Sequence, residues 1–121
     1  MLDRAFGMDV HQETMVIGKL LPDRKETRRF SVLRREDIEE AKEVAQEDDC
    51  MNGVMESTGV YWVPIYAAFK EAGFKLSVAN AQQVKAIPGR KSDYNDAEWL
   101  AYLLKAEVVK PSYIPDEKYQ G

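Results

Sequence analysis

The N-terminal third of the chain consists of short hydrophobic segments separated by polar turns, a pattern typical of β-strands. Residues 4–9 and 14–21 are two such segments, and the four residues between them suit a hairpin turn. Residues 22–25, Pro-Asp-Arg-Lys, favour another turn, after which residues 27–33 alternate as a third strand. The pattern therefore predicts three consecutive antiparallel strands.

The hydrophobic period then changes from that of a strand to that of a helix. Residues 35–47 carry one apolar stripe, which predicts the first helix. Asn52-Gly53 is expected to break this pattern, and a short strand follows that ends at Glu56. The apolar stripe consists of Ile38, Ala41, Val44 and Ala45.

A second helix is predicted after Ser57-Thr58-Gly59, whose residue types start helices, and before Gly73, which ends it. Proline is tolerated only in the first turn of a helix, so Pro64 favours a start slightly later than Gly59. The segment has one apolar face, which we expect to pack inward. This face consists of Trp62, Ile65, Tyr66, Phe69 and Ala72.

The last predicted elements are a strand over residues 74–78, a loop over 80–89 and a helix over 93–106. The full order is then β-β-β-α-β-α-β-α. Hairpin strands followed by strand–helix crossovers require a mixed sheet with helices packed on its faces. This is the α/β element order of the RNase H-like fold. The inward positions of the last helix are Ala97, Leu100, Ala101 and Leu104.

Length and composition indicate one domain of ordinary kind. The 121 residues suit a single domain, and a hydrophobic fraction of 45% can supply its core. We expect that domain to span residues 1–110, and residues 111–121, with two prolines and no period, to form an exit linker. No apolar run reaches the roughly 18 residues of a membrane span, and the N-terminus lacks a signal-peptide pattern. A cytoplasmic location, with no membrane partner, is the expectation.

Single residue types exclude some functions and leave others open. Cys50 is the only cysteine, which excludes a disulfide framework and a thiolate zinc site. The net charge of −4 argues against a general nucleic-acid coat. Basic residues nevertheless gather in two stretches, each of which is either solvated surface or a phosphate-binding surface. The first comprises Arg24, Lys25, Arg28, Arg29, Arg34 and Arg35, and the second Lys85, Arg90 and Lys91.

Four carboxylates stand where the predicted topology brings distant segments together. Asp9 closes the first strand, Glu56 closes the strand after the first helix, and Asp93 and Asp96 begin the last helix. The two strands are neighbours in such a fold, so their C-terminal ends can meet that helix. We expect Asp93 to point along the helix face that packs on the sheet.

Each acid alone has a simpler interpretation. Asp9 can be a strand end that reaches solvent, and Glu56 an acid near a helix N-terminus. Ser92 or Asp93 can be the N-cap of the last helix. Together, however, like charges about 4 Å apart repel by roughly 4 kcal/mol per pair at an effective dielectric near 20. Such a cluster takes up protons or binds divalent cations, and oxygen ligands favour Mg²⁺ or Mn²⁺, the ions of nuclease and strand-transfer chemistry.

Three motifs resemble the DEDD transposases of bacterial insertion sequences, in order and spacing over essentially the whole chain. They are Gly7-Met8-Asp9-Val10-His11, Met55-Glu56-Ser57-Thr58-Gly59-Val60-Tyr61-Trp62 and Pro88-Gly89-Arg90-Lys91-Ser92-Asp93-Tyr94-Asn95-Asp96-Ala97-Glu98-Trp99-Leu100-Ala101. The resemblance implies a RuvC-like domain for DNA strand cleavage and transfer. Its catalytic, metal-binding quartet corresponds to Asp9, Glu56, Asp93 and Asp96, with Mg²⁺ or Mn²⁺ as cofactor.

The resemblance also implies partners and further protein. Members of the family recombine DNA under the guidance of an element-encoded RNA, and the full-length protein is expected to be a homo-oligomer. They continue into a helical region and a second domain with a nucleophilic serine. This chain stops before either, so the fragment alone is expected to be incomplete as an enzyme.

Residues near the quartet have functional and structural interpretations. Lys85, Arg90 and Lys91 can hold phosphates, which position a nucleic acid without specifying its sequence. Tyr61 can stack on bases, whereas the tryptophans at 62 and 99 suit packing. His11 can contact a metal-bound water, although an exposed turn histidine is the simpler interpretation.

Three other classes of protein remain as alternatives. A stand-alone RuvC-type structure-specific endonuclease shares the fold and the carboxylates. A non-catalytic nucleic-acid-binding or assembly fragment is compatible with the chain as well. An actin-like sugar kinase or ATPase also opens with an acid between two strands, but it needs glycine-rich phosphate turns that residues 10–13 lack.

Overall fold

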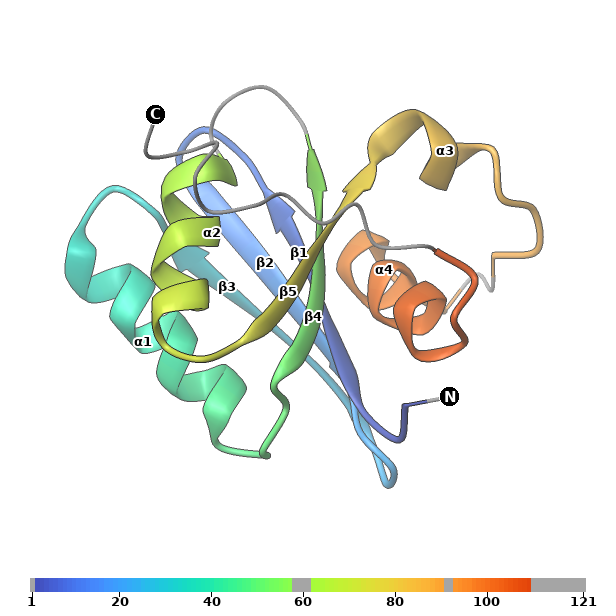
Figure 1. Ribbon diagram of the computed structural model, residues 1–121, viewed down its shortest axis with the longest axis horizontal. Coiled ribbons are helices and arrows are strands. Elements are labelled where there is room, and N and C mark those ends of the chain that lie inside the picture. The colour runs from blue at the N-terminus through green and yellow to red at the C-terminus, as the bar shows by residue number, and fades with distance from the viewer. Residues whose placement is uncertain (1, 58–61, 91–92, 110–121) are drawn as a thin grey trace.

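The computed structural model describes residues 2–57, 62–90 and 93–109, and within them the chain forms one five-stranded sheet of order β3-β2-β1-β4-β5 (Figure 1). The first three strands pair antiparallel, and β4 joins β1 and β5 in parallel. The predicted mixed sheet is confirmed. The strands are β1 (Ala5–Val10), β2 (Thr14–Leu20), β3 (Lys25–Ser31), β4 (Asn52–Ser57) and β5 (Lys75–Asn80).

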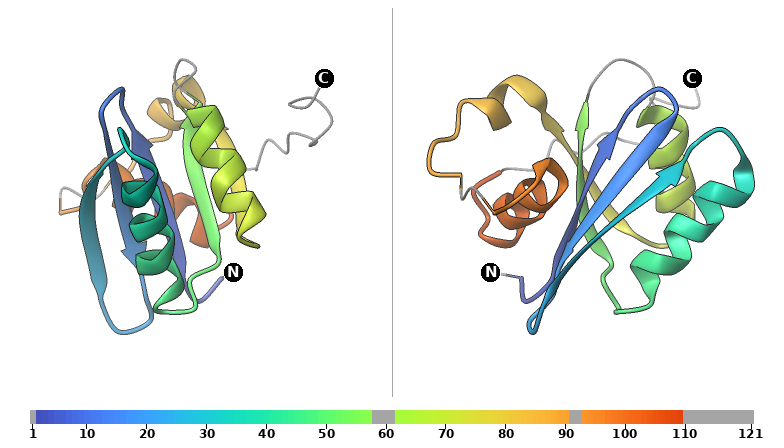
Figure 2. Two further views of the ribbon diagram at one scale, coloured as in Figure 1. Left: turned by 90° about the vertical axis from the view of Figure 1, so that its left-hand side faces the viewer. Right: turned by 180° about the vertical axis from the view of Figure 1, so that it is seen from behind.

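Helices cover both faces of the sheet, so the domain has three layers (Figures 1 and 2). The helices α1 (Arg35–Gln46) and α2 (Trp62–Glu71) pack on one face, and α4 (Asp96–Lys105) packs on the other. A short helix, α3 (Ala81–Lys85), follows β5 directly. None of the described helices combines the length and apolarity needed to cross a membrane.

Each face of the sheet has its own hydrophobic core. Under α1 and α2, Phe6 of β1 meets Phe69 and Phe74 with ring centroids 6.0 and 5.7 Å apart. Under α4, Leu100 is fully buried against the opposite face, beside Val54. The predicted inward positions of the last helix, Ala97, Leu100, Ala101 and Leu104, are all buried.

The helix α4 rests directly on sheet backbone at two glycines. Gly7 of β1 and Gly18 of β2 lie opposite each other in the antiparallel register. A Cβ on Gly7 would overlap the carbonyl oxygen of Ala97, and one on Gly18 would lie 2.7 Å from the backbone nitrogen of Glu98. Only glycine permits this approach, which fixes the first turns of α4 against β1.

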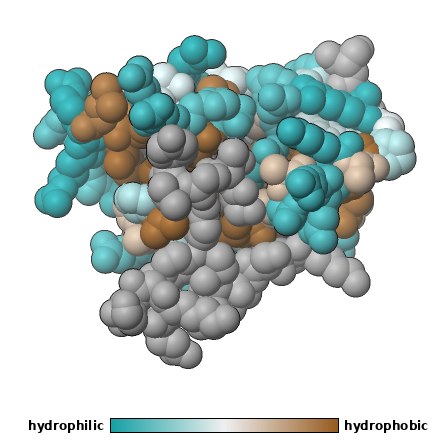
Figure 3. Space-filling view, turned by 90° about the horizontal axis from the view of Figure 1, so that it is seen from above, coloured by the Kyte–Doolittle hydropathy of each residue, from teal (hydrophilic) through white to brown (hydrophobic). Residues whose placement is uncertain are grey.

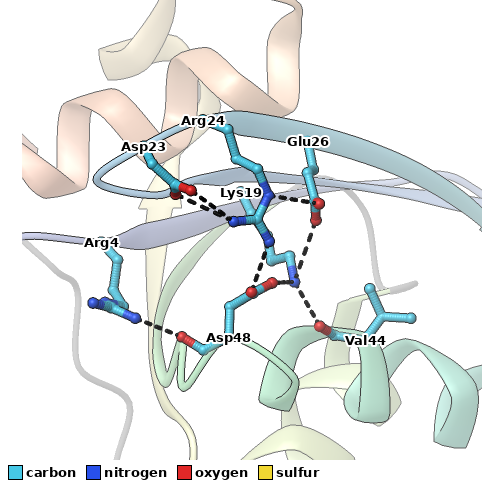
Figure 4. A network of polar contacts seen from close by, with 7 residues as sticks. All are labelled: Arg4, Lys19, Asp23, Arg24, Glu26, Val44 and Asp48. Carbon is cyan, nitrogen blue, oxygen red and sulfur yellow. Dashed lines mark hydrogen bonds and ion pairs between the residues drawn. The ribbon is translucent and has the colours of Figure 1, made fainter.

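A buried lysine ties α1 to the β2–β3 hairpin (Figure 4). Lys19 is 1% exposed, and its Nζ donates to the Val44 carbonyl oxygen at 2.7 Å and to Asp48. Arg24 donates to the same Asp48 carboxylate at 2.8 Å and to Glu26 at 3.0 Å. Hydrogen bonds from Lys19 and then Arg24 hold the pKa of Asp48 below its ordinary value. A buried charge is tolerated here because it is fully paired.

Three predicted boundaries are wrong for identifiable reasons. The short strand predicted to follow Asn52-Gly53 begins at Asn52 itself, because these two residues pair with Lys75 and Leu76 of β5. The loop predicted over residues 80–89 contains α3, since the Asn80 side chain caps it by accepting from the backbone of Gln82 and Gln83.

The third correction concerns the last helix, predicted over 93–106. It begins at Asp96 with Asn95 as its N-cap, so neither Ser92 nor Asp93 has that role. The other ends shift by one or two residues: the strands predicted over 4–9, 27–33 and 74–78 occupy 5–10, 25–31 and 75–80. The predicted exit linker, 111–121, lies outside the described residues.

Candidate active site

Two carboxylates lie side by side at the C-terminal ends of neighbouring parallel strands. In the parallel register Gly7 pairs with Val54 and Met8 with Met55, so Asp9 and Glu56 are the next residues on β1 and β4. Strand alternation puts both on the face that carries α4, together with Gly7. Because α4 is seated on Gly7, its N-terminal residue Asp96 reaches the same end of the sheet.

These three carboxylates line one cavity of about 470 Å³, here called the carboxylate cavity. Asp9, Glu56 and Asp96 share it with His11 and with the predicted phosphate-binding residues Lys85 and Arg90. The molecule's face at this end carries many hydrophilic side chains (Figure 3). Three members of the predicted quartet, from three separate segments, therefore converge on one space.

The fields of the three carboxylates overlap. Burial raises the pKa of Glu56 above its ordinary value, and the negative charges of Asp9 and Asp96 raise it further, while Lys85 and His11 act in the opposite direction. The His11 Nε2 lies 3.2 Å from a carboxylate oxygen of Asp9. The site thus disfavours its own full ionisation, which is the electrostatic condition that a bound cation relieves.

Arg90 compensates part of this charge. Its guanidinium donates to Asp96 Oδ1 at 2.7 Å and to the Tyr94 carbonyl oxygen at 2.6 Å. The side chains of Arg90 and Asp96 remain 41% and 64% exposed, so the pair is accessible to solvent and to ligands. Arg90 therefore joins the segment before α4 to the first residue of the helix.

Asp93 stands apart from the other three acids. Its side chain is 70% exposed and lies 3.5 Å from Lys25 Nζ, which also donates to its carbonyl oxygen at 2.8 Å. The expectation that Asp93 points along the packed face of the last helix is wrong, because the helix begins three residues later. Its place in the quartet stays a prediction from the family resemblance.

The donor set fits a hard divalent cation, but the side chains are not yet gathered around one. Carboxylate oxygens are the ligands that Mg²⁺ and Mn²⁺ prefer. Among the described residues, no three acidic, histidine or cysteine side chains lie close enough together to hold a metal. Asp96 is engaged by Arg90 and Asp9 by His11, so these partners would have to move when a metal binds.

Of the other residues singled out in the sequence, one is confirmed as a packing residue, and the rest, or their side chains, lie outside the part of the chain that the structure describes. Trp99 is 6% exposed and stacks on Tyr102 with centroids 5.4 Å apart, as expected of a packing residue, although it also lines the carboxylate cavity. Tyr61 and Lys91 lie outside the described residues, as does the side chain of Trp62.

Glu98 positions the start of α4 and is not among the residues that the sequence analysis singles out as functional. It is 6% exposed and forms a capping box with Asn95, and its second oxygen accepts from the Thr27 hydroxyl at 2.8 Å. The start of α4, and with it Asp96, is thereby fastened to β3. The spacing of Asn95 and Glu98 is that of a capping box and indicates this helix start.

We expect Glu56→Gln to stabilise the metal-free domain at neutral pH. The pKa of Glu56 is raised on folding, so the ionised side chain destabilises the fold. That penalty is absent below the unfolded pKa, about 4.3, and complete once the pH exceeds the raised folded pKa. In EDTA, the melting curves of wild type and Glu56→Gln should therefore differ near pH 7 and coincide near pH 4. Glu43→Gln, at an exposed acid on α1, is the matched control, and equal melting of wild type and Glu56→Gln at pH 7 would contradict the shared field.

The strand order, the helices on both faces and the acids at the ends of β1 and β4 define an RNase H-like domain of the RuvC type. The solved structure of T. thermophilus RuvC in complex with Holliday junction substrate matches with a TM-score of 0.59 and 15% sequence identity, over 91% of this chain and 99% of that chain. This similarity confirms the predicted fold.

The family follows from the sequence. The family model of DEDD transposases, described as transposase, matches residues 6–121, and the chain belongs to this family. The family assignment made from the three motifs is therefore confirmed. A search of curated proteins gives no significant match.

Proposed function

We propose that this chain is the catalytic domain of a transposase that cleaves and transfers DNA strands with Mg²⁺ or Mn²⁺. The observation that carries the proposal is the convergence of Asp9, Glu56 and Asp96 on the carboxylate cavity. Family membership and the RuvC-type fold support the reaction class. Asp93 would complete the quartet after a rearrangement of the segment before α4.

The residues of the cavity have distinct parts in this chemistry. Divalent ions bound by the carboxylates would activate the attacking group and stabilise the leaving oxygen of a phosphodiester. Asp9 and Glu56 would supply ligands from the paired strands β1 and β4, and Asp96 would supply one from α4, which is seated on Gly7 of β1. Lys85 and Arg90 position backbone phosphates beside them, a role proposed for Tyr61 and Lys91 as well.

DNA is the proposed partner, together with an element-encoded guide RNA and further copies of the protein. The RuvC structure that shares this fold is a complex with a Holliday junction substrate, which supports a branched DNA as ligand. The same similarity favours one alternative, a structure-specific endonuclease that acts without further domains. Cleavage of a four-way junction by residues 1–121 alone would favour that alternative.

Metal binding is expected to raise the melting temperature of the wild-type chain. A ligand at about 100 times its Kd that binds only the folded state adds about 2.7 kcal/mol, and each kcal/mol corresponds to roughly 4 °C for a domain between the 60–100- and 150–250-residue classes. Millimolar Mn²⁺ or Mg²⁺ should therefore shift the thermal melt by several degrees, and Asp9→Asn should blunt the shift.

Asp3→Asn is the control, because Asp3 is an exposed acid of the same N-terminal segment that pairs with Arg4 outside the cavity. Its variant should show the wild-type metal shift. A wild-type melting curve that does not move across a manganese titration would count against the metal site.

A further inference from the structure

A second hollow lies on the other side of the Asp9 and Asp96 carboxylates. It has a volume of about 340 Å³ and is lined by Asp9, Asp96, Val16, Thr27 and Arg29 together with the start of α4. We call it the β3-side hollow. It shares Asp9 and Asp96 with the carboxylate cavity, so the two spaces meet at this pair of acids.

The sheet register places the side chain of Arg29 in this second hollow. Asp9 lies opposite Val16, and Val16 lies opposite Arg29, so the three residues form a row across β1, β2 and β3. Residues in such a row share one face of the sheet, here the face that carries α4. Two strand spacings separate the backbones of Asp9 and Arg29 by about 10 Å.

The other polar residues on this side of β3 have partners, whereas Arg29 is available. Lys25 binds Asp93, and Thr27 bonds with Glu98 and Asn95. Arg29 is exposed, and its guanidinium has no hydrogen bond or ion pair with the part of the chain that the structure describes. Its neighbour Arg28 points to the opposite face, 3.7 Å from Glu40.

We propose that Arg29 holds a backbone phosphate of the nucleic-acid strand on the β3 side of the active site, an inference that rests on the proposed function. Lys85 and Arg90 lie in the carboxylate cavity and Arg29 in the β3-side hollow, with Asp9 and Asp96 between them. The nucleic-acid strand therefore runs across the carboxylates, from Lys85 and Arg90 on one side to Arg29 on the other.

The charge pattern selects an extended polyanion over a small phosphate. A lone phosphate beside Arg29 would also face the negative charges of Asp9 and Asp96, which makes this a weak site for a single anion. A strand with regularly spaced phosphates can place one on each group of cations, and the phosphate between them lies at the carboxylates, where a metal would bind. Arginine suits this position because its planar fork binds phosphate oxygens in pairs.

The test compares Arg29→Ala with Arg28→Ala in the full chain. Arg28 is the matched control, since it lies next to Arg29 on β3 but on the opposite face. Binding of fluorescein-labelled DNA duplex, four-way junction and RNA of the same sequence is measured by anisotropy across a salt series. Arg29→Ala should weaken binding by about threefold to tenfold and lower the salt slope by about 0.9 on duplex DNA or about 0.7 on a single strand, the loss of one phosphate contact.

Two further variants separate a phosphate contact from a structural role. Arg29→Lys should keep the wild-type salt slope, because the charge remains, while Lys85→Ala should lower the slope as Arg29→Ala does. If Arg29→Ala lowers the salt slope with only one of the three probes, that probe identifies the kind of strand that Arg29 holds. If Lys85→Ala lowers the slope and Arg29→Ala does not, the inference is overturned and the proposed function stands. A wild-type chain that binds none of the probes would overturn both.

Discussion

Asp96→Ala will abolish strand cleavage and transfer while leaving the domain folded. Asp96 is 64% exposed and contacts Arg90, so its contribution to stability is at most about 1 kcal/mol, that of an exposed first-turn acid. The helix is held instead by buried Leu100 and Leu104 and by the Asn95–Glu98 capping box. As the proposed metal ligand, by contrast, the side chain would support several kcal/mol of transition-state stabilisation, so its removal should lower the rate on the order of 10³-fold or more.

The measurement is recombination by the complete reading frame that carries the change, alongside the thermal melt. DNA binding should persist, because Lys85 remains and Arg90 is released from its carboxylate partner. Glu36→Ala removes a first-turn acid from α1 and serves as the control for helix-start effects. Wild-type recombination by Asp96→Ala would remove this residue from the site, and a collapsed fold would mean that its main role is structural.

Gly7→Ala is expected to destabilise the domain by about 2–3 kcal/mol, and with it to displace Asp96 from Asp9. The added methyl group would overlap the Ala97 carbonyl oxygen and lie 2.8 Å from the Ala101 backbone nitrogen. Backbone atoms cannot rotate away as a side chain can, so α4 must lift from the sheet. Overpacking of this kind costs typically 1–3 kcal/mol, a large part of the roughly 5–15 kcal/mol that stabilises a domain.

The thermal melt should fall by about 10 °C or more. Gly18→Ala should act in the same direction, since its Cβ would lie 2.7 Å from the Glu98 backbone nitrogen. Gly89→Ala adds the same methyl group in open space and should cost only the strain of its positive φ, about 1 kcal/mol. Equal melting of Gly7→Ala and wild type would show that α4 is not seated as described.

The order of elements could be predicted because each segment's hydrophobic period agrees with its place in the fold. The start of α4 is predicted three residues too early, because Ser92 and Asp93 are acceptable N-caps when each residue is considered alone. Only Asn95 has a glutamate three residues later, which completes a capping box, and Glu98 in turn accepts a hydrogen bond from Thr27, 71 positions away. The error carried over to Asp93, whose predicted direction depended on that start.

The candidate site shows the same division. Asp9 and Glu56 could be placed together from topology alone, because parallel neighbours end at one edge of the sheet. The pairing of Asp96 with Arg90 depends on side-chain positions and could not be read from spacing. The burial of Lys19 could not be read from spacing either. Lys19 is a polar residue within a strand, and its hydrogen-bond partners, Val44 and Asp48, come from another segment of the chain.

The Arg90–Asp96 ion pair makes the two ligands of the proposed site thermodynamically linked. A metal ion that takes Asp96 frees a guanidinium for a phosphate, and a phosphate that takes Arg90 frees a carboxylate for the metal. Each ligand removes a competitor of the other, so each raises the other's affinity by the same factor. Metal and nucleic acid should then bind cooperatively. A metal ion should be bound more weakly when nucleic acid is absent than when it is present.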